Sequence, residues 1–233
     1  MIVHRVTDQF PLFLPASKTP RSPGVHMSGI IRCIATETGI LKPEWAEEIS
    51  LTDVRTITDP TAILRINIGL AWEQHYIGTL MEPYGIADHP SEVEIDGIYG
   101  SPDAESVSVI KSIKCNDYTP AQSVKHVCHE IKATYKSTKT VGDLTSQWMW
   151  LTQLKAYCKA LGTRFAVLHI LFLCGDYTYP IKPVREVYEI EFTQQEVDDC
   201  WDLLRDYRDQ RQNKEKIIDD LVDKAWDHIV EET

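Results

Sequence analysis

An acid and a base lie two positions apart in the apolar segment HEIKATY, residues 129–135. Alternate side chains of an extended strand share a face, so Glu130 and Lys132 point to one side while His129 and Ile131 point to the other. Burying either charge without a partner is costly. The pair therefore belongs either at a solvated strand edge or in a site whose chemistry needs both charges.

A second acid, Asp103, follows a Gly-Ser-Pro turn at the start of the preceding predicted strand. Neighbouring antiparallel strands lie about 5 Å apart, so Asp103 and Glu130 can converge despite their separation in the chain. Two such carboxylates repel each other, and a divalent cation removes the repulsion; hard oxygen ligands favour Mg²⁺ or Mn²⁺. Such an ion polarises a phosphodiester, and Lys132 opposes the negative charge that develops.

Each of these residues also has a structural interpretation. Glu130 and Lys132 fit a solvated cross-strand charge pattern, and Asp103 fits a turn aspartate that accepts hydrogen bonds from its own backbone. Asp96, in the segment EIDG, is a rival for the role of Asp103 because it is also an acid at a strand end. The Ser-Pro that precedes Asp103 favours Asp103.

The predicted order of elements would bring these side chains together. Helices are expected at 26–40, 59–81 and 144–162, β-like runs at 92–100, 101–110 and 123–134, and a strand covered on both faces at 164–177. The order predicts an α/β fold with a mixed β-sheet flanked by helices. In it an antiparallel hairpin is extended by a strand that arrives through a crossover helix.

The C-terminal part should add a short strand and then helices. Residues 187–192 are strand-like, and TQQE is a capping box with Thr193 as cap and Glu196 three residues on. Two amphipathic helices are expected after it. The chain thus divides into an N-terminal arm (1–25), a core (26–192) and an acidic helical extension (193–233) that packs on the core or on a partner.

Composition predicts an intracellular, cytoplasmic protein that does not enter a membrane. The 233 residues are 43% hydrophobic, and no window approaches the roughly 18 apolar residues of a membrane span. The N-terminus lacks the pattern of a signal peptide. The six cysteines are spread singly without C-x-x-C spacing, which predicts free thiols and no cysteine metal site.

The net charge of −11 is concentrated at the C-terminal end. Residues 186–233 hold 16 acids and 6 bases, a net of −10, which leaves −1 for residues 1–185. Near the acid and base pair the sign reverses, because six lysines face only two acids between residues 111 and 139. This local excess suits a nucleic-acid phosphate backbone, although solvated lysines on a strand edge give the same pattern.

Four motifs in order resemble the PD-(D/E)XK nuclease superfamily. SPDA followed by EIK fills the pattern that names the superfamily. This resemblance implies a restriction-endonuclease-like core. The helical acid Glu73 in GLAWE, with Gln153 and Tyr157 in QLKAY, resembles the branch that holds lambda-type exonuclease, the RecB nuclease domain and Cas4. The resemblance covers residues 26 to 180, but the four cluster-binding cysteines of Cas4 have no counterpart.

The resemblance implies roles for the matched residues. Asp103, Glu130 and the backbone carbonyl of Ile131 would bind the metal, with Glu73 binding it directly or through water, and Lys132 would position the attacking water. Gln153 and Tyr157, four apart on one helical face, would reach the same phosphate or the lysine. Further DNA contacts are expected from residues outside this cluster: Lys136, Ser137, Ser28 and, more weakly matched, His26.

The implied function is a magnesium- or manganese-dependent deoxyribonuclease that cuts from DNA ends and leaves 5′-phosphates. Stand-alone enzymes of this kind serve recombination, repair or genome processing in viruses and phages, often beside a strand-annealing protein, and ring-shaped trimers occur among relatives. Two alternatives stay open: a restriction-type or structure-specific endonuclease, and an inactive DNA-binding or assembly module with the same fold. The full set of catalytic residues weighs against the inactive module.

Overall fold

The computed structural model describes residues 22–42, 60–81, 91–111 and 122–231, with backbone alone for 80–81, 108–111, 122–125 and 215–231. Its strands form a three-stranded and a four-stranded sheet. The elements are β1 (Val25–His26), α1 (Met27–Glu37), α2 (Pro60–Tyr76), the π-helical turn η2 (Ile77–Met81), β2 (Val93–Ile95), β3 (Ile98–Gly100), β4 (Ala104–Lys111), β5 (Gln122–Thr134), α3 (Thr138–Val141), the 3₁₀ turn η4 (Leu144–Ser146), α4 (Trp148–Ala160), β6 (Phe165–Phe172), β7 (Val184–Glu191) and α5 (Gln194–Glu231).

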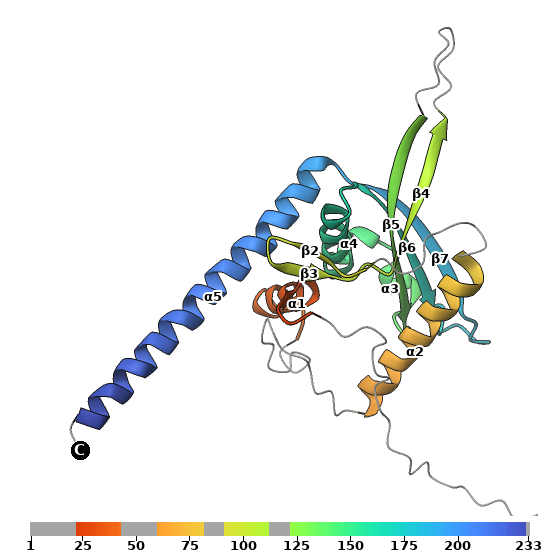
Figure 1. Cartoon of the computed structure of the whole chain (residues 1–233). Helices are drawn as coiled ribbons and strands as arrows, with labels where there is room; N and C mark the ends of the chain where they lie inside the picture. The colour runs from red at the N-terminus through yellow and green to blue at the C-terminus, as the bar shows by residue number, and fades with distance from the viewer. Residues whose placement is uncertain (1–21, 43–59, 82–90, 112–121, 232–233) are drawn as a thin grey trace, which may run out of the picture.

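The larger sheet has the strand order β4-β5-β6-β7 and is mixed. β4 and β5 are antiparallel, β5 and β6 are parallel, and β6 and β7 are antiparallel. Helix α4 makes the crossover from β5 to β6 (Figure 1). The predicted fold, a mixed sheet flanked by helices in which a hairpin is extended through a crossover helix, is confirmed.

Helices cover both faces of this sheet. Buried β6 residues such as Leu168 and Ile170 pack with α1, α4 and the first turns of α5 in the main core. On the opposite face, Tyr76 at the end of α2 and Ile77 at the start of η2 pack against Ala104 and Ile131. The two faces of β5 are therefore distinct: odd-numbered residues near its end face α2, and even-numbered residues face α4.

The small sheet differs from the expected single run at 92–100. That segment is a hairpin of β2 and β3, because Asp96 (φ 52°) and Gly97 (φ 74°) form a tight turn with two positive φ angles. β1 pairs in parallel with β3, and Val25 is buried. Val25 was expected to end the N-terminal arm and instead belongs to the core; residues 1–21 lie outside the described part.

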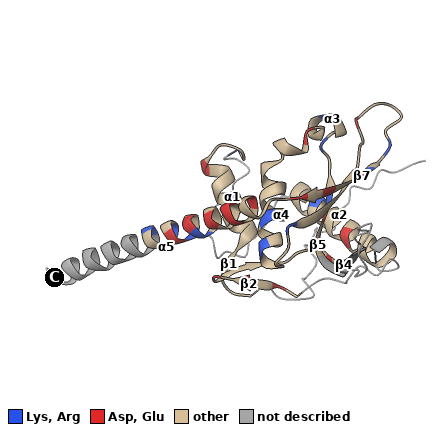
Figure 2. Cartoon of the chain, turned by 90° about the horizontal axis from the view of Figure 1, so that it is seen from above, with Lys and Arg blue, Asp and Glu red and all other residues tan. Residues whose placement is uncertain are grey.

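The C-terminal extension is one helix, and the prediction of two helices was wrong. No glycine or proline interrupts residues 194–231, so α5 continues for 38 residues and runs out beyond the body of the protein (Figures 1 and 2). The predicted capping box is present: the Glu196 carboxylate accepts from the Thr193 backbone at 2.8 Å, and the Thr193 hydroxyl accepts from the Glu196 backbone at 3.2 Å.

The other sequence expectations concern membranes and cysteines. None of the helices in the described ranges is long and apolar enough to cross a bilayer. The cysteines of the described ranges are free thiols, as expected: Cys33, Cys128, Cys158, Cys174 and Cys200. Cys115 lies outside these ranges.

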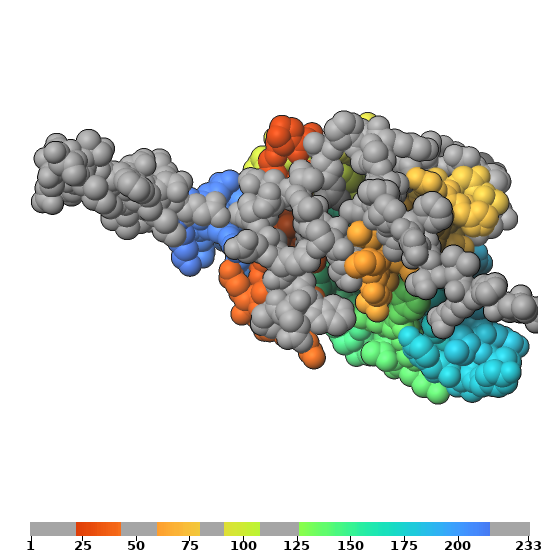
Figure 3. Space-filling view, turned by 90° about the horizontal axis from the view of Figure 1, so that it is seen from below, coloured from red at the N-terminus to blue at the C-terminus, as the bar shows by residue number. Residues whose placement is uncertain are grey.

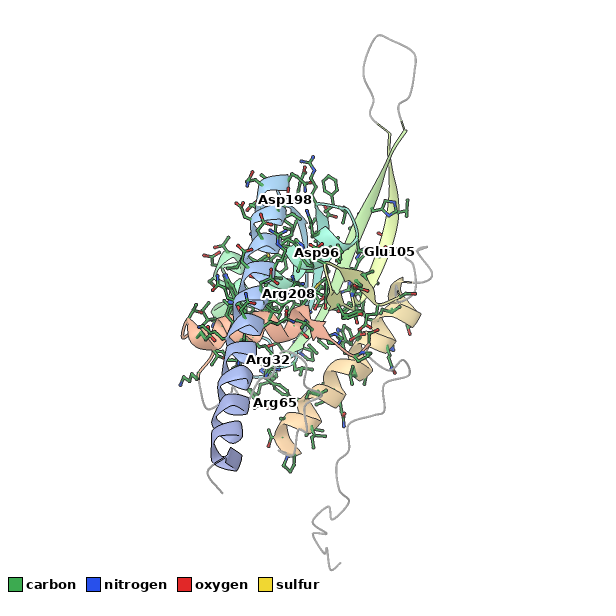
Figure 4. All side chains as sticks on the ribbon, turned by 60° about the vertical axis from the view of Figure 1, so that its left-hand side comes forward. Arg32, Arg65, Asp96, Glu105, Asp198 and Arg208 are labelled. Atoms are coloured by element: carbon green, nitrogen blue, oxygen red, sulfur yellow. The ribbon has the colours of Figure 1, made fainter. Side chains whose placement is uncertain are left out.

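Helix α5 holds the small hairpin through its turn. The indole of Trp201, which is 2% exposed, donates to the Asp96 carboxylate at 2.8 Å, and Arg208 donates to the Asp96 backbone carbonyl. Figure 4 shows Asp96 and Arg208 next to each other at α5. Asp96, the rival for a catalytic role, therefore docks the hairpin on α5.

Replacing Asp96 tests this docking. Asp96→Ala leaves the buried indole N–H of Trp201 without its acceptor, so we expect the free energy of unfolding to fall by about 1–3 kcal/mol. Asp96→Asn keeps an oxygen acceptor and tolerates the positive φ, so its loss should be below about 1 kcal/mol. Urea denaturation measures both values. Equal losses in the two variants would contradict the assigned hydrogen bond.

Candidate active site

The acid and base of HEIKATY lie on the α4 face of β5. Glu130 is 1% exposed, and the Lys132 side chain is 24% exposed. The Lys132 ammonium group donates to Glu130 Oε1 and, at 3.1 Å, to Gln153 Oε1 on α4. The solvated-edge interpretation of Glu130 is therefore wrong, because β5 is an inner strand and its carboxylate is buried in contact with the lysine.

Helix α4 extends this chain of hydrogen bonds by one further residue. Gln153 and Tyr157 are four residues apart on one helical face, and Gln153 Nε2 donates to the Tyr157 hydroxyl at 3.0 Å. Tyr157 is 5% exposed, and its ring lies against Gly100 at the end of β3, where a Cβ atom would approach the ring to 3.2 Å. Tyr157 thus fixes Gln153, and Gln153 contacts the lysine.

Asp103 reaches the same place from the neighbouring strand. The register pairs Ala104 with His129, which places Asp103 opposite Glu130 just before β4 begins. Asp103 Oδ2 accepts a hydrogen bond from the backbone N–H of Ile131 at 2.7 Å. The carboxylate therefore bonds β5 instead of its own turn, unlike an ordinary turn aspartate.

Glu73 approaches from α2. Its carboxylate is partly exposed, and it interacts electrostatically with Glu130 and Lys132. Tyr76, one helical turn further, fixes this end of α2 because its hydroxyl is hydrogen-bonded to His169 Nδ1 at 2.9 Å. The structure thus brings together the six residues that the motifs single out: Glu73, Asp103, Glu130, Lys132, Gln153 and Tyr157.

Crowding of carboxyl groups dominates the electrostatics of this cluster. Burial, and then the charge of Asp103, raise the pKa of Glu130 to about 8. Burial is also the main cause that raises the pKa of Asp103 and of Glu73 to about 7 each. For Lys132, burial lowers the pKa, but the surrounding acids outweigh burial and raise it. The lysine therefore stays protonated, while the acids bind protons more tightly than free carboxylates do.

One oxygen of this cluster is unsatisfied. Glu130 Oε2 is buried and has no hydrogen-bond partner among the described residues. A buried carboxylate oxygen without a partner is unfavourable, and a divalent cation bound by Glu130 and Asp103 would satisfy it. The donor set thus fits a hard cation. No preformed cluster of three or more acidic, histidine or cysteine ligands occurs within the described ranges, so the carboxylates are not yet gathered around a single point.

The further DNA contacts expected from the sequence lie in other places. Lys136 donates to Gln147 at 2.8 Å, and the Ser137 hydroxyl caps α3 by accepting from the backbone of Lys139. Ser28 lies in the first turn of α1, and His26 contacts the backbone carbonyl of Ser22 at 3.0 Å. Their roles in DNA binding stay predictions.

A buried polar chain on the opposite face of the sheet was not predicted. The Ser106 hydroxyl contacts His129 at 2.7 Å, His129 contacts His169 at 3.0 Å, and His169 contacts Tyr76. Burial lowers the pKa of His129 to about 4 and that of His169 to about 3, so both rings are neutral. Strand alternation placed His129 opposite Glu130, but the pairing with His169 depends on a parallel register that the sequence does not reveal.

The fold and the cluster define a mixed α/β protein with buried acids and one lysine at the centre of its sheet. No family model matches the sequence, and no curated protein is significantly similar to it. The structure is similar to LHK-Exo in complex with dAMP, with 14% identity, a TM-score of 0.51, and coverage of 87% of this chain and 94% of that chain. A second structure of this alkaline exonuclease from Laribacter hongkongensis has 10% identity, a TM-score of 0.49 and the same coverage. The fold of this chain is therefore that of LHK-Exo.

The raised pKa values predict that metal binding releases protons. Acids with raised pKa values bind protons that compete with a cation, so the affinity for Mn²⁺ should rise as pH rises through about 7 to 8. Calorimetry of Mn²⁺ binding in buffers with different ionisation enthalpies measures the number of protons released. We expect fewer protons for Asp103→Asn. Binding heats that are independent of the buffer at pH 7 would contradict the prediction.

Proposed function

We propose that this protein is a metal-dependent deoxyribonuclease that hydrolyses DNA phosphodiester bonds. The observation that carries the proposal is the buried Glu130–Lys132 pair with Asp103 beside it and an unsatisfied carboxylate oxygen within it. A structural ion pair does not need a second and a third acid around one lysine. A site that binds a cation and an anionic substrate needs both acids and base.

The residues of the candidate site would have distinct roles in this reaction. Glu130 and Asp103, with the Ile131 carbonyl and Glu73, would hold Mg²⁺ or Mn²⁺, which when bound polarises the phosphate and lowers the pKa of a water molecule. Lys132 has three N–H groups, of which Glu130 and Gln153 accept two. The third can orient the attacking water or stabilise negative charge on the phosphate.

Support for DNA as the substrate comes from two sources. The fold is that of an exonuclease whose structure contains dAMP. In the sequence, residues 111–139 hold six lysines and two acids, a local excess of positive charge. On these grounds, together with the order of the four motifs, we propose that the enzyme belongs to the exonuclease branch and cuts from DNA ends, in recombination, repair or viral genome processing.

Two other functions compete with this proposal. A structure-specific or restriction-type endonuclease would use the same acids and lysine, and a digestion assay separates it from an exonuclease. An inactive DNA-binding or assembly module would not need the unsatisfied oxygen of Glu130, nor a lysine held by two acceptors. A strand-annealing partner and assembly into a homo-oligomer remain part of the proposal, to be tested after activity.

Replacing the lysine tests the proposed function. Lys132→Ala should lower cleavage of linear DNA in Mg²⁺ by at least about 100-fold, because it removes the group that orients water and opposes charge. Lys159→Ala is the matched control on α4, since Lys159 pairs with Asp198 at 2.7 Å at the partly exposed contact with α5. We expect full activity in this control and folded circular-dichroism spectra in both. Full activity of Lys132→Ala would refute the role of Lys132.

Digestion of linear and closed circular DNA shows whether the enzyme cuts from DNA ends or at internal sites. We expect the wild-type protein to degrade linear DNA and to leave closed circles intact, both tested as single and double strands. Cleavage of closed circles would establish the endonuclease alternative. Absence of cleavage of every substrate in Mg²⁺ and in Mn²⁺, with DNA binding retained, would establish the inactive module.

A further inference from the structure

The connection between β6 and β7, residues 173–183, exposes large apolar side chains. Tyr177, Tyr179 and Ile181 are 52%, 91% and 55% exposed, which places three of them within five residues. Single exposed apolar residues are common on protein surfaces, but a group on one loop marks a contact surface. Figure 3 shows this segment, in cyan, standing out next to the green segment that follows β5.

The loop is held in place by several contacts. The backbone N–H of Thr138 donates to the Gly175 carbonyl at 3.1 Å, and Lys139 pairs with Asp176 at 3.1 Å. The Tyr177 hydroxyl donates to the backbone carbonyl of Tyr135. Gly175 has a φ of 53°, and a Cβ atom there would collide with the backbone of the same loop, so the tight bend requires glycine. The tyrosines are therefore presented on a fixed support.

Cations accompany these aromatic rings. The guanidinium group of Arg65, on α2 (Figure 4), lies 5.6 Å from the ring centre of Tyr135. Lys139, Lys182 and Tyr179 line an open surface cleft of about 450 Å³. We call Tyr135, Tyr177, Tyr179, Lys139 and Lys182 together the tyrosine ledge.

Two acids also line this cleft, and both are engaged. The Asp176 carboxylate accepts from the backbone and hydroxyl of Thr178 and pairs with Lys139. The Glu186 carboxylate accepts from the hydroxyl of Tyr188. The two lysines and two acids of the cleft balance each other in charge, and Arg65 beside Tyr135 adds one further positive charge. The exposed tyrosine rings beside lysines suit a ligand that carries both planar groups and phosphates.

The tyrosine ledge adjoins the candidate active site. Tyr135 follows Lys132 by three residues, which corresponds to about 10 Å along an extended chain. The Lys136 ammonium group lies 4.9 Å from the ring centre of Trp150. Trp150 is three residues before Gln153 on α4. Lys136 thus lies beside α4, on the side of Lys132, whereas Tyr135 lies beside Arg65 of α2, and the end of β5 joins the two.

We propose that the tyrosine ledge binds the unpaired bases of single-stranded DNA next to the active site, an inference that rests on the proposed function. Exposed aromatic rings interleaved with cations bind single strands, because every base has a face to stack and every phosphate a charge. A duplex keeps its bases stacked and would leave the tyrosines uncovered. Three exposed side chains are too small a surface for a stable contact with a second copy of the chain, which needs about 1,200 Å² or more.

Binding of a fluorescein-labelled oligothymidylate to the full chain in EDTA, followed by anisotropy, tests the ledge without cleavage. Tyr179→Ala should weaken binding about 5- to 20-fold, the range expected for one lost stacking contact. Tyr179→Trp should retain the wild-type affinity. Ile40→Ala is the matched control, because Ile40 is 51% exposed beyond the end of α1, and it should bind like the wild type. An abasic oligonucleotide of equal length should not distinguish Tyr179→Ala from the wild type.

Each other result overturns the inference. Equal affinity of Tyr179→Ala and the wild type, or no binding by the wild type, would show that the ledge does not bind single strands. The same loss with the abasic oligonucleotide would exclude base stacking. A change of oligomeric state in Tyr179→Ala, with unchanged DNA affinity, would assign the ledge to contacts between chains.

The cleavage assay separates this inference from the proposed function. If the protein cleaves DNA but Tyr179→Ala binds DNA like the wild type, only the proposed role of the tyrosine ledge is refuted. If the protein cleaves no DNA but Tyr179→Ala lowers its affinity for DNA, only the proposed nuclease function is refuted.

Discussion

One buried carboxylate, that of Glu130, determines how the rest of the site must be arranged. It lies at the centre of the sheet and is 1% exposed. One of its oxygens accepts a hydrogen bond from Lys132, and the other has no hydrogen-bond partner among the described residues. Removing such a pair from water costs several kcal/mol per ion, and apolar residues of similar volume are often at least as stable. Stability therefore does not explain the pair, which the proposed binding of a cation and an anionic substrate would explain.

The fold brings polar side chains to the Glu130–Lys132 pair from three directions. The β4–β5 register places Asp103 opposite Glu130, the crossover helix α4 brings Gln153 to Lys132, and α2 carries Glu73. Each of the three depends on packing remote from the site. Tyr76, for example, anchors α2 on the opposite face of the sheet through a hydrogen bond to His169. The site is thus a product of long-range contacts between elements that are individually ordinary.

Much of this was predictable from the sequence because it depends on local patterns. Strand alternation separates Glu130 from His129, helical spacing pairs Gln153 with Tyr157, and the Thr193 capping box starts α5. The turn at Asp96 was missed although Asp-Gly is a strong hairpin signal, because residues 92–100 were taken as one strand-like run. The single long α5 was missed because two helices were expected in a segment that has no glycine or proline to separate them.

What could not be predicted depends on register and on exposure. The Ser106–His129–His169–Tyr76 chain needs the parallel pairing of β5 with β6, and the tyrosine ledge needs a loop that bends back onto α3. Neither leaves a periodic signal. The roles of Lys136, Ser137 and Ser28 in DNA binding were inferred from the resemblance alone, and their contacts in the structure neither require nor oppose those roles.

The most direct test of the central claim is an anomalous difference map from crystals soaked in Mn²⁺. The account predicts a peak bound by the carboxylates of Asp103 and Glu130, with Glu130 Oε2 among its ligands. It would be contradicted by a protein that cleaves DNA in Mn²⁺ while the map shows no ion at these carboxylates and the Glu130–Lys132 contact is unchanged.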